Sequence, residues 1–343
     1  MKSRGILRNA LKRGALLTAA NWQVVVIQFV AEATFKLLLA IPILGGAFLA
    51  TLLLGQSLEE LAAGDLREIL AAATAALLAR PAALIGFLTA LLVVLLGGSV
   101  IMFVVKAGTI SVLVGADGHA GLIERPPLRL SEFERAMWFS AGRFTAGASR
   151  LWRRFVWLGL VLLGLYAASA ALYALVVVRS YQEVAGGAPL LGWTLVAVLL
   201  SSLLIAWVTV VNLFYLLVQI VMGVTDRSVV GAFREVLRFL RADLRNVAGV
   251  FAFVLMLVVV AMILSLMATW GLGLIAFVPL AGLLVLPLQL GAWFIRNLLF
   301  QYLGLTALTA YLTLYRSRMI LPDVSTPGGD ERGPAGSFGE QMP

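Results

Sequence analysis

Residues 84–105 read LIGFLTALLVVLLGGSVIMFVV, a run without a charged side chain. An α-helix rises about 1.5 Å per residue and the hydrocarbon core of a bilayer is about 30 Å thick, so this run is long enough to cross a membrane. The sequence therefore predicts an all-α fold, a polytopic transmembrane helical bundle of about six spans. The other predicted spans are residues 155–178, 190–224, 247–267 and 272–295, each without a charged residue, and the interrupted stretch 22–54.

The composition agrees with a membrane protein. Of the 343 residues, 62% are hydrophobic and 13% are charged, whereas a soluble domain has about 25% charged residues. The chain contains no cysteine and one histidine, which excludes disulfides, thiolate nucleophiles and thiolate zinc sites. It contains no Walker loop, GxSxG motif or dinucleotide fingerprint in a strand–turn–helix setting. We therefore expect no cofactor and no metal, and a non-enzymatic role is favoured.

Basic residues are distributed unevenly among the connections. The N-terminal arm and the loops after the second and fourth spans contain 17 Lys and Arg residues, whereas the alternate connections contain three. Cytoplasmic connections are the ones enriched in Lys and Arg, so both termini are predicted to be cytoplasmic. The net charge of +9 follows from this topology and does not require a nucleic-acid partner.

The basic segments also have the periodicity of amphipathic helices. The clearest example has Val229, Phe233, Val236, Leu237, Leu240 and Leu244 on one predicted face and arginines on the other. Such helices lie in the membrane interface, and their basic faces predict contacts with anionic lipid headgroups. The predicted headgroup contacts are Arg8, Lys12, Arg13, Arg234, Arg238, Arg241 and Arg245.

The chain can be divided into a transmembrane domain, residues 1–315, and a tail, residues 316–343. The domain contains three possible repeats, each a basic helix followed by two spans, at residues 4–115, 130–224 and 227–315. The alternative is that these similarities arise by chance in so apolar a composition. The tail is rich in Pro, Gly and Ser and poor in large apolar residues, which predicts a disordered cytoplasmic segment.

Charged groups at membrane depth are candidates for function, because an Arg, Lys or Asp at the centre of a span costs about 2.5–3.5 kcal/mol. Glu32 and Lys36 are four residues apart and share a helix face. They form either a structural ion pair or a gate linked to protons or ions. Lys106 and Arg296 either extend to the headgroups or line a cavity that binds phosphate or carboxylate.

The second span of each possible repeat carries a similar tag, VVK at residues 104–106, VVN at 210–212 and IRN at 295–297. These tags make Lys106, Asn212 and Asn297 equivalent positions. The predicted intramembrane polar site therefore consists of Glu32, Lys36, Lys106, Asn212, Arg296 and Asn297.

Three further segments carry local predictions. Residues 272–315 would form one helix about 66 Å long, so Pro279 and Pro287 are expected to break or kink it. A seventh span at residues 298–315 would place two arginines outside, against the charge rule. Gly115–Gly121 predicts an exposed turn around His119, and residues 57–80 predict an interfacial helical hairpin.

The layout of paired spans, each preceded by an amphipathic helix such as AFREVLR at residues 232–238, resembles a known membrane domain. This is the domain associated with glycerophosphoryl diester phosphodiesterases and with related uncharacterised bacterial six-span proteins. The resemblance covers residues 1–315 and implies a stand-alone module in a bacterial inner membrane. It implies no active-site residues, because the catalytic barrel of that family is a separate soluble domain.

Two functions stay open on the sequence. The first is a non-enzymatic module that organises lipids or partner proteins. The alternative is a transporter or channel for a small anionic solute, which predicts charges that converge on a cavity, whereas the module predicts dry apolar packing. An intramembrane enzyme is disfavoured because it needs two titratable groups facing a cavity, and Glu32 is the one plausible acid within a span.

Overall fold

The computed structural model describes residues 2–54, 80–124, 127, 130–185, 190–276 and 281–320. The regular secondary structure of these residues is entirely helical, and six of the described helices are long and apolar enough to cross a membrane. The predicted fold class is therefore confirmed, and the protein is an integral membrane protein. The helices are α1 (Lys2–Ala20), α2 (Trp22–Leu54), α5 (Pro81–His119), α6 (Leu130–Ala136), α7 (Ala141–Ala185), α8 (Leu190–Thr225), α9 (Val229–Ala276), α10 (Ala281–Tyr315) and the π-helix η1 (Arg316–Ile320).

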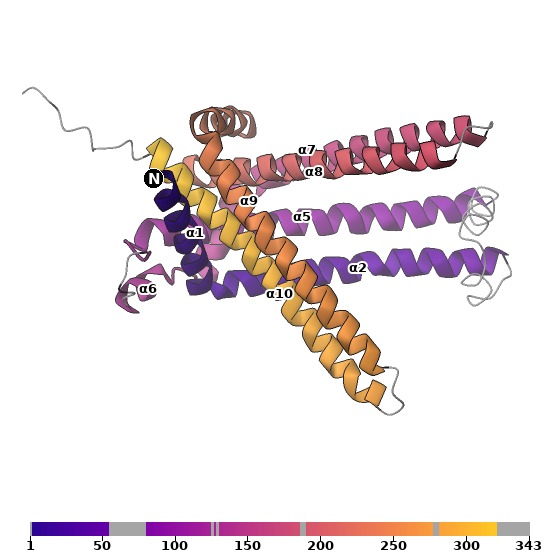
Figure 1. Ribbon diagram of the computed structural model, residues 1–343, viewed down its shortest axis with the longest axis horizontal. Coiled ribbons are helices and arrows are strands. Elements are labelled where there is room, and N and C mark those ends of the chain that lie inside the picture. Colours follow the sequence, from indigo (N-terminus) through magenta and orange to yellow (C-terminus); the bar gives the residue numbers. More distant parts are fainter. Residues whose placement is uncertain are drawn as a thin grey trace, which may run out of the picture.

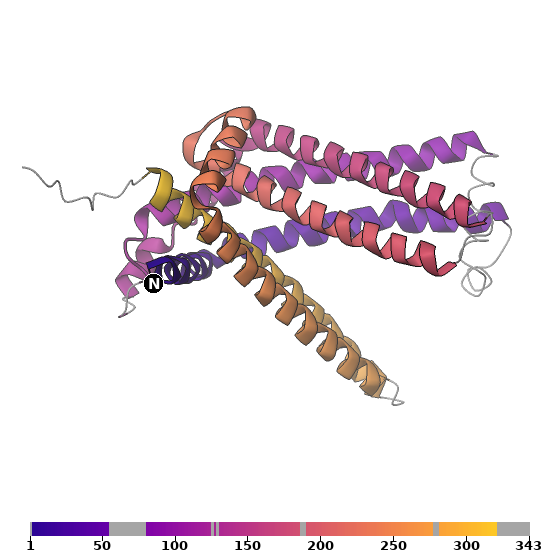
Figure 2. The same ribbon diagram turned by 45° about the horizontal axis from the view of Figure 1, so that its top comes forward.

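The long helices form two arms. Helices α2, α5, α7 and α8 run side by side as one arm, and α9 and α10 form a hairpin that diverges from it (Figures 1 and 2). The arms meet at one end of the molecule, which we call the joined end. Helix α1 lies across the joined end and packs along α10 (Figure 1). This contact requires Gly14, because a Cβ there would lie 2.7 Å from the carbonyl oxygen of Thr306.

The buried core is concentrated at the joined end. Its largest fully buried side chains come from five of the long helices, from α1 and from the chain after α5, and include Leu17, Leu113, Ile123, Phe155, Leu217, Phe239 and Leu312. Toward the opposite end, most large apolar side chains of the described spans are exposed. Apolar surface of this extent is stable in lipid rather than in water.

The apolar stretch of residues 272–315 is divided differently from the prediction. Helix α9 continues to Ala276, shortly before Pro279, and α10 begins at Ala281 and runs through Pro287. The predicted last span, residues 272–295, is therefore wrong. Residues 298–315 are the second half of α10 and not a seventh span, because the helix continues into the core of the joined end instead of ending at the membrane surface.

The predicted exposed turn around His119 is wrong in one part: His119 is exposed, but it belongs to a helix and the turn begins only at Gly121. Helix α5 continues to His119, whose ring stacks on Trp138 with centroids 3.8 Å apart. A Cβ at Gly115 would overlap the indole nitrogen of Trp138. Glycine at this position therefore permits close packing of α5 against Trp138 and does not form a turn.

Order continues past Tyr315, where the tail was predicted to begin. Residues Arg316–Ile320 form η1, and Arg316 and Arg318 make ion pairs with Asp117 and Asp243. These ion pairs explain why residues 316–320 form a helix where the composition predicts disorder. Their acidic partners lie far away in the sequence, so the local composition does not reveal them. Residues 321–343 and almost all of the predicted hairpin at 57–80 lie outside the described residues.

The three basic segments differ in form. Helices α1 and α6 are separate from the spans that follow them, whereas the third segment is the first part of α9, which bends at Asp243. The backbone there has φ −144° and ψ 39°. The threefold repeat stays a prediction.

Candidate functional site

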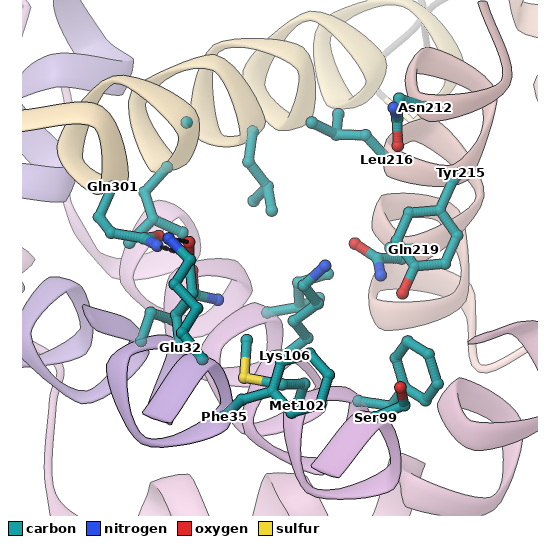
Figure 3. Close-up of a pocket in the computed structure, with 17 residues that line it drawn as sticks. Glu32, Phe35, Ser99, Met102, Lys106, Asn212, Tyr215, Leu216, Gln219 and Gln301 are labelled. Atoms are coloured by element: carbon teal, nitrogen blue, oxygen red, sulfur yellow. Dashed lines mark hydrogen bonds and ion pairs between the residues drawn. The ribbon is translucent and has the colours of Figure 1, made fainter. Parts of the chain in front are cut away.

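A cavity of about 540 Å³ lies at the joined end, between α2, α5, α8 and α10 (Figure 3). It is partly open, and its wall combines apolar side chains with polar ones from all four helices. The polar lining residues are Gln28, Glu32, Lys36, Ser99, Lys106, Asn212, Tyr215, Gln219 and Gln301.

Four of these polar residues lie at similar distances from the remote ends of their helices. The end of each helix that is remote from the joined end serves as the reference point. These ends are Leu54 of α2, Pro81 of α5, Leu190 of α8 and Ala281 of α10. At the helical rise of about 1.5 Å per residue, Glu32, Lys106, Asn212 and Gln301 lie about 30 to 38 Å from these ends. A hydrocarbon core is about 30 Å thick. The cavity therefore lies about one hydrocarbon thickness from the remote ends of its helices.

Both carboxylate oxygens of Glu32 have partners. The Nζ of Lys36 lies 2.5 Å from Oε1, which is the ion pair that the four-residue spacing predicts. The amide nitrogen of Gln301 donates a hydrogen bond to Oε2. Because Gln301 belongs to α10 and Glu32 to α2, this hydrogen bond joins the two arms of the molecule.

Lys106 differs from Lys36 in having no carboxylate within ion-pair distance among the described residues, and the charge of Glu32 acts on it only from farther away. Within the described part of the chain, its Nζ makes no hydrogen bond and no ion pair, and it lies 5.1 Å from the ring centroid of Tyr215. Figure 3 shows Lys106 between the Glu32 and Gln301 side of the cavity and the Tyr215 and Gln219 side. With two lysines and one glutamate, the described lining carries an excess positive charge.

Two more polar groups of the cavity wall are unsatisfied. The hydroxyl of Tyr215 and the amide nitrogen of Gln219 are buried and make no hydrogen bond of ordinary geometry within the described residues. The two side chains interact weakly with each other, although neither atom makes a hydrogen bond of ordinary geometry. A buried unsatisfied polar group costs about 1–3 kcal/mol, so a ligand that accepts hydrogen bonds would be stabilised here.

Two other lining residues are held by neighbouring helices. The hydroxyl of Tyr166 on α7 donates to Oδ1 of Asn212 at 2.5 Å. The amide nitrogen of Gln28 lies 3.2 Å from Oγ1 of Thr109 on α5. These hydrogen bonds orient Asn212 and Gln28, which therefore contribute to the wall without offering all of their polar atoms to a ligand.

Compared with known proteins, the chain matches no family model, no curated protein and no solved structure. The geometry of the cavity is therefore the basis for any functional conclusion. Among the residues that the structure describes, no group of three or more acidic or histidine side chains is placed to hold a metal ion.

The structure brings four of the six predicted site residues into the cavity wall, namely Glu32, Lys36, Lys106 and Asn212. Arg296 is exposed and lies outside the wall. Asn297 lines a separate small hollow beside Glu32 and donates a hydrogen bond to the carbonyl of Trp293 at 2.7 Å.

The position of Asn297 shows why the predicted equivalence fails in the last span. Lys106 and Asn212 are both about 20 Å from the end of their helix at the joined end, but Asn297 is about 27 Å from the corresponding end of α10. Gln301 is about 21 Å from that end and therefore occupies the corresponding depth. Asn297, at the end of the IRN tag, lies about one helical turn before Gln301 along α10.

Sequence reasoning missed Tyr215, Gln219 and Gln301. It weighed charged residues and short tags, whereas these side chains are neutral. A usable signal was present, because glutamine is rare in apolar spans and Gln28, Gln219 and Gln301 all line the cavity.

A second charged cluster at the joined end is fully paired. Asp117, with a side chain only 4% exposed, accepts from Arg13 at 2.7 Å and from Arg316 at 2.8 Å. Arg13 also binds Glu124 at 2.9 Å. Burial alone would lower the pKa of Arg13, but the charges and hydrogen bonds of Asp117 and Glu124 outweigh burial and raise it.

This pairing separates the predicted headgroup contacts into two groups. Arg13 and Lys12 bind the segment after α5, Lys12 through the carbonyl of Glu124 at 2.8 Å. Arg238 pairs with Glu235 at 2.9 Å. The remaining predicted contacts are exposed and make no ion pair with any described residue, and for them the headgroup contact stays a prediction: Arg8, Arg234, Arg241 and Arg245.

The first part of α9 packs most of its predicted apolar face on the core, including Val229 and Leu240, but the prediction is wrong at its edges. Val236 is buried as expected, but Glu235 and Asp243 are also buried, and Phe233 and Leu244 are exposed. The difference arises because ion pairs with arginines stabilise the buried acids. The exposed face therefore combines apolar and basic side chains, which is typical of a helix at a membrane interface.

Proposed function

We propose that this integral membrane protein is a non-enzymatic module that binds an anionic ligand in the cavity between α2, α5, α8 and α10. The observation that carries the proposal is the ammonium of Lys106, which faces the cavity without a carboxylate partner among the described residues. The unsatisfied groups of Tyr215 and Gln219 supply further hydrogen-bond donors. A phosphate or a carboxylate matches this donor set, whether it belongs to a lipid headgroup or to a free solute.

The membrane orientation is part of the same proposal. Positively charged connections favour the cytoplasmic side, and the joined end carries these connections and both ends of the described chain. The cavity would then face the cytoplasmic leaflet of a bacterial inner membrane, and the module would organise anionic lipid there. This role agrees with the membrane domain that the layout of the chain resembles.

The test measures thermal unfolding of the purified protein in a nonionic detergent. The probes are inorganic phosphate, short-chain phosphatidylglycerol and short-chain phosphatidylcholine. We expect at least one anionic probe to raise the Tm and the zwitterionic lipid to leave it unchanged, because a ligand that binds the folded state stabilises it.

Two variants make the test specific to the cavity. Lys106→Gln should abolish the rise in Tm, whereas Arg296→Gln should retain it, since Arg296 lies on a cavity-forming helix but outside the cavity. An equal rise in Lys106→Gln, or no rise with either anionic probe in the wild type, would overturn the proposal.

Transport of a small anionic solute is the second candidate, and one observation favours it. Glu32, Lys36 and Lys106 converge on one cavity instead of lying against a dry apolar interface. Uptake of radiolabelled phosphate into proteoliposomes discriminates the two candidates. Uptake that depends on Lys106 would support transport, and binding without uptake would support the module.

A further inference from the structure

We infer that the ligand of the cavity is a lipid, whose anionic headgroup binds beside Lys106 and whose acyl chains lie along apolar helix faces that continue the cavity wall. The inference rests on the proposed anion binding and adds the chemical class of the ligand. Three features carry it: the direction of the cavity-lining faces, the exposure of those faces and the depth of the cavity.

The cavity-lining faces continue away from the joined end. Residues seven apart on a helix lie on nearly the same face. On α5, two such steps lead from Lys106 through Ser99, which also lines the cavity, to Leu92. On α8, the same steps lead from Asn212 through Ile205 to Val198.

On α10, one step of seven residues leads from Gln301 to Phe294, and a further turn leads to Leu290. Beyond the polar groups the cavity face is mostly apolar on all three helices, with Ser201 on α8 and Asn297 on α10 as polar members. An amphiphile has the same division, with a charged group at one end and hydrocarbon at the other.

The described chain leaves these continuing faces largely uncovered, and the contact it does make is the edge-to-face packing of Phe294 on Phe29 of α2, with ring centroids 4.8 Å apart. Leu92, Ile205, Val198, Phe294 and Leu290 are all between 47% and 67% exposed. In a closed helical bundle, the residues that continue a core-lining face are themselves buried. Here they remain uncovered because the α9–α10 hairpin diverges from the other arm (Figures 1 and 2).

Depth and charge select lipid as the occupant of this space. The polar groups lie about one hydrocarbon thickness from the remote helix ends, so the apolar faces lie at the depth of acyl chains. The excess positive charge of the cavity is complementary to an anionic headgroup. A second copy of the chain is a poorer match, because its own cavity carries the same excess positive charge.

The experiment keeps the headgroup constant and varies the chains. Glycerol phosphate represents the headgroup without chains, and dioleoyl phosphatidic acid represents the complete lipid. Binding to the purified full-length protein in nonionic detergent is followed by native mass spectrometry and by titration. We expect the lipid to bind at least tenfold more tightly than glycerol phosphate.

Matched variants test where the chains lie. Leu92→Gln and Ile205→Gln place a polar group on the continuing faces and should weaken lipid binding about tenfold, with the affinity for glycerol phosphate unchanged. Val93→Gln and Leu199→Gln are the controls, because these residues are similarly apolar and at least as exposed but point about 120° away from those faces. The controls should bind lipid as the wild type does, and they report any effect of a polar side chain on folding.

The possible outcomes separate this inference from the proposed function. Equal affinity for glycerol phosphate and lipid, or unchanged lipid binding in Leu92→Gln and Ile205→Gln, would overturn the inference and leave anion binding intact. Failure of both probes to bind the wild type would overturn the proposed function as well. A wild-type dimer that Leu92→Gln and Ile205→Gln convert to a monomer would show that a second copy occupies the faces, which also overturns the inference.

Discussion

Two clusters of charge, both close to the joined end, differ in how completely they are paired. The Asp117 cluster consists of Asp117, Glu124, Arg13 and Arg316, and the Glu32 cluster of Glu32, Lys36 and Lys106. The first has two carboxylates for two cations, whereas the second has one carboxylate for two cations. Both arginines bind Asp117 directly, at 2.7 and 2.8 Å, but only Lys36 binds Glu32 in this way, at 2.5 Å.

The difference indicates different roles. The Asp117 cluster connects α1, α5 and η1, and its charges satisfy one another, so its contribution is to hold the joined end together. The Glu32 cluster leaves the ammonium of Lys106 facing a cavity. A cation that the fold places beside a cavity without a carboxylate partner is poised to bind an anion from outside the chain.

The largest expected effect comes from breaking the Asp117 cluster. Asp117→Asn leaves two arginines at the joined end without their shared anion, and removal of one partner of a buried pair costs about 3–5 kcal/mol. The free energy of unfolding, measured by titration with sodium dodecyl sulfate in mixed micelles, should fall by this amount. Glu134→Gln, an exposed acid on α6, is the control and should change it by less than about 0.5 kcal/mol.

A smaller loss is expected from the packing that supports the same cluster. Gly14→Val would place a Cβ 2.7 Å from the carbonyl oxygen of Thr306 and 2.8 Å from the amide of Ala310, so α1 must move away from α10. Such overpacking costs about 1–3 kcal/mol. The same unfolding titration measures it, with Gly5→Val as the control because no atom lies within 4 Å of a Cβ at Gly5. Equal losses in the two variants would mean that helix propensity, and not the crossing of α1 and α10, is responsible.

In the Glu32 cluster, removal of a charge is expected to raise the free energy of unfolding instead of lowering it. Lys106→Met removes a charge without a carboxylate partner and should raise the free energy of unfolding by about 1 kcal/mol when no anion is present, since apolar replacements of buried charges are often stabilising. The rise in Tm caused by an anionic probe should disappear at the same time. If Lys106→Met is instead as destabilising as Asp117→Asn, the two clusters have the same structural role and the comparison fails.

The smallest effect is expected from the one predicted site cation that lies outside both clusters. Arg296 is exposed and makes no ion pair within the described residues, so Arg296→Gln should change the free energy of unfolding by less than about 0.5 kcal/mol. Its response to an anionic probe should equal that of the wild type. A loss of that response would place Arg296 in the site, as the sequence tag predicts.

Local features of the chain were sufficient to predict the architecture of the membrane domain. An uncharged run of about 20 residues crosses a bilayer whatever its neighbours are, which is why six spans could be counted from the sequence. The Glu32–Lys36 ion pair was predictable for the same reason, since both residues lie one turn apart on one helix. The boundary between α9 and α10 was harder, because apolar character continues across it and does not mark where the chain turns.

The composition and order of residues determined a helical membrane protein with basic connections, and they nominated four of the residues that line the cavity. Only the tertiary structure placed Gln301 rather than Asn297 at the depth of Lys106, left Lys106 without a carboxylate partner among the described residues, and brought Arg13 and Arg316 together on Asp117. The physical reason is distance along the chain. Span formation depends on neighbouring residues, whereas the pairing of these charges depends on the register of helices that are far apart in the sequence, and tertiary packing alone sets that register.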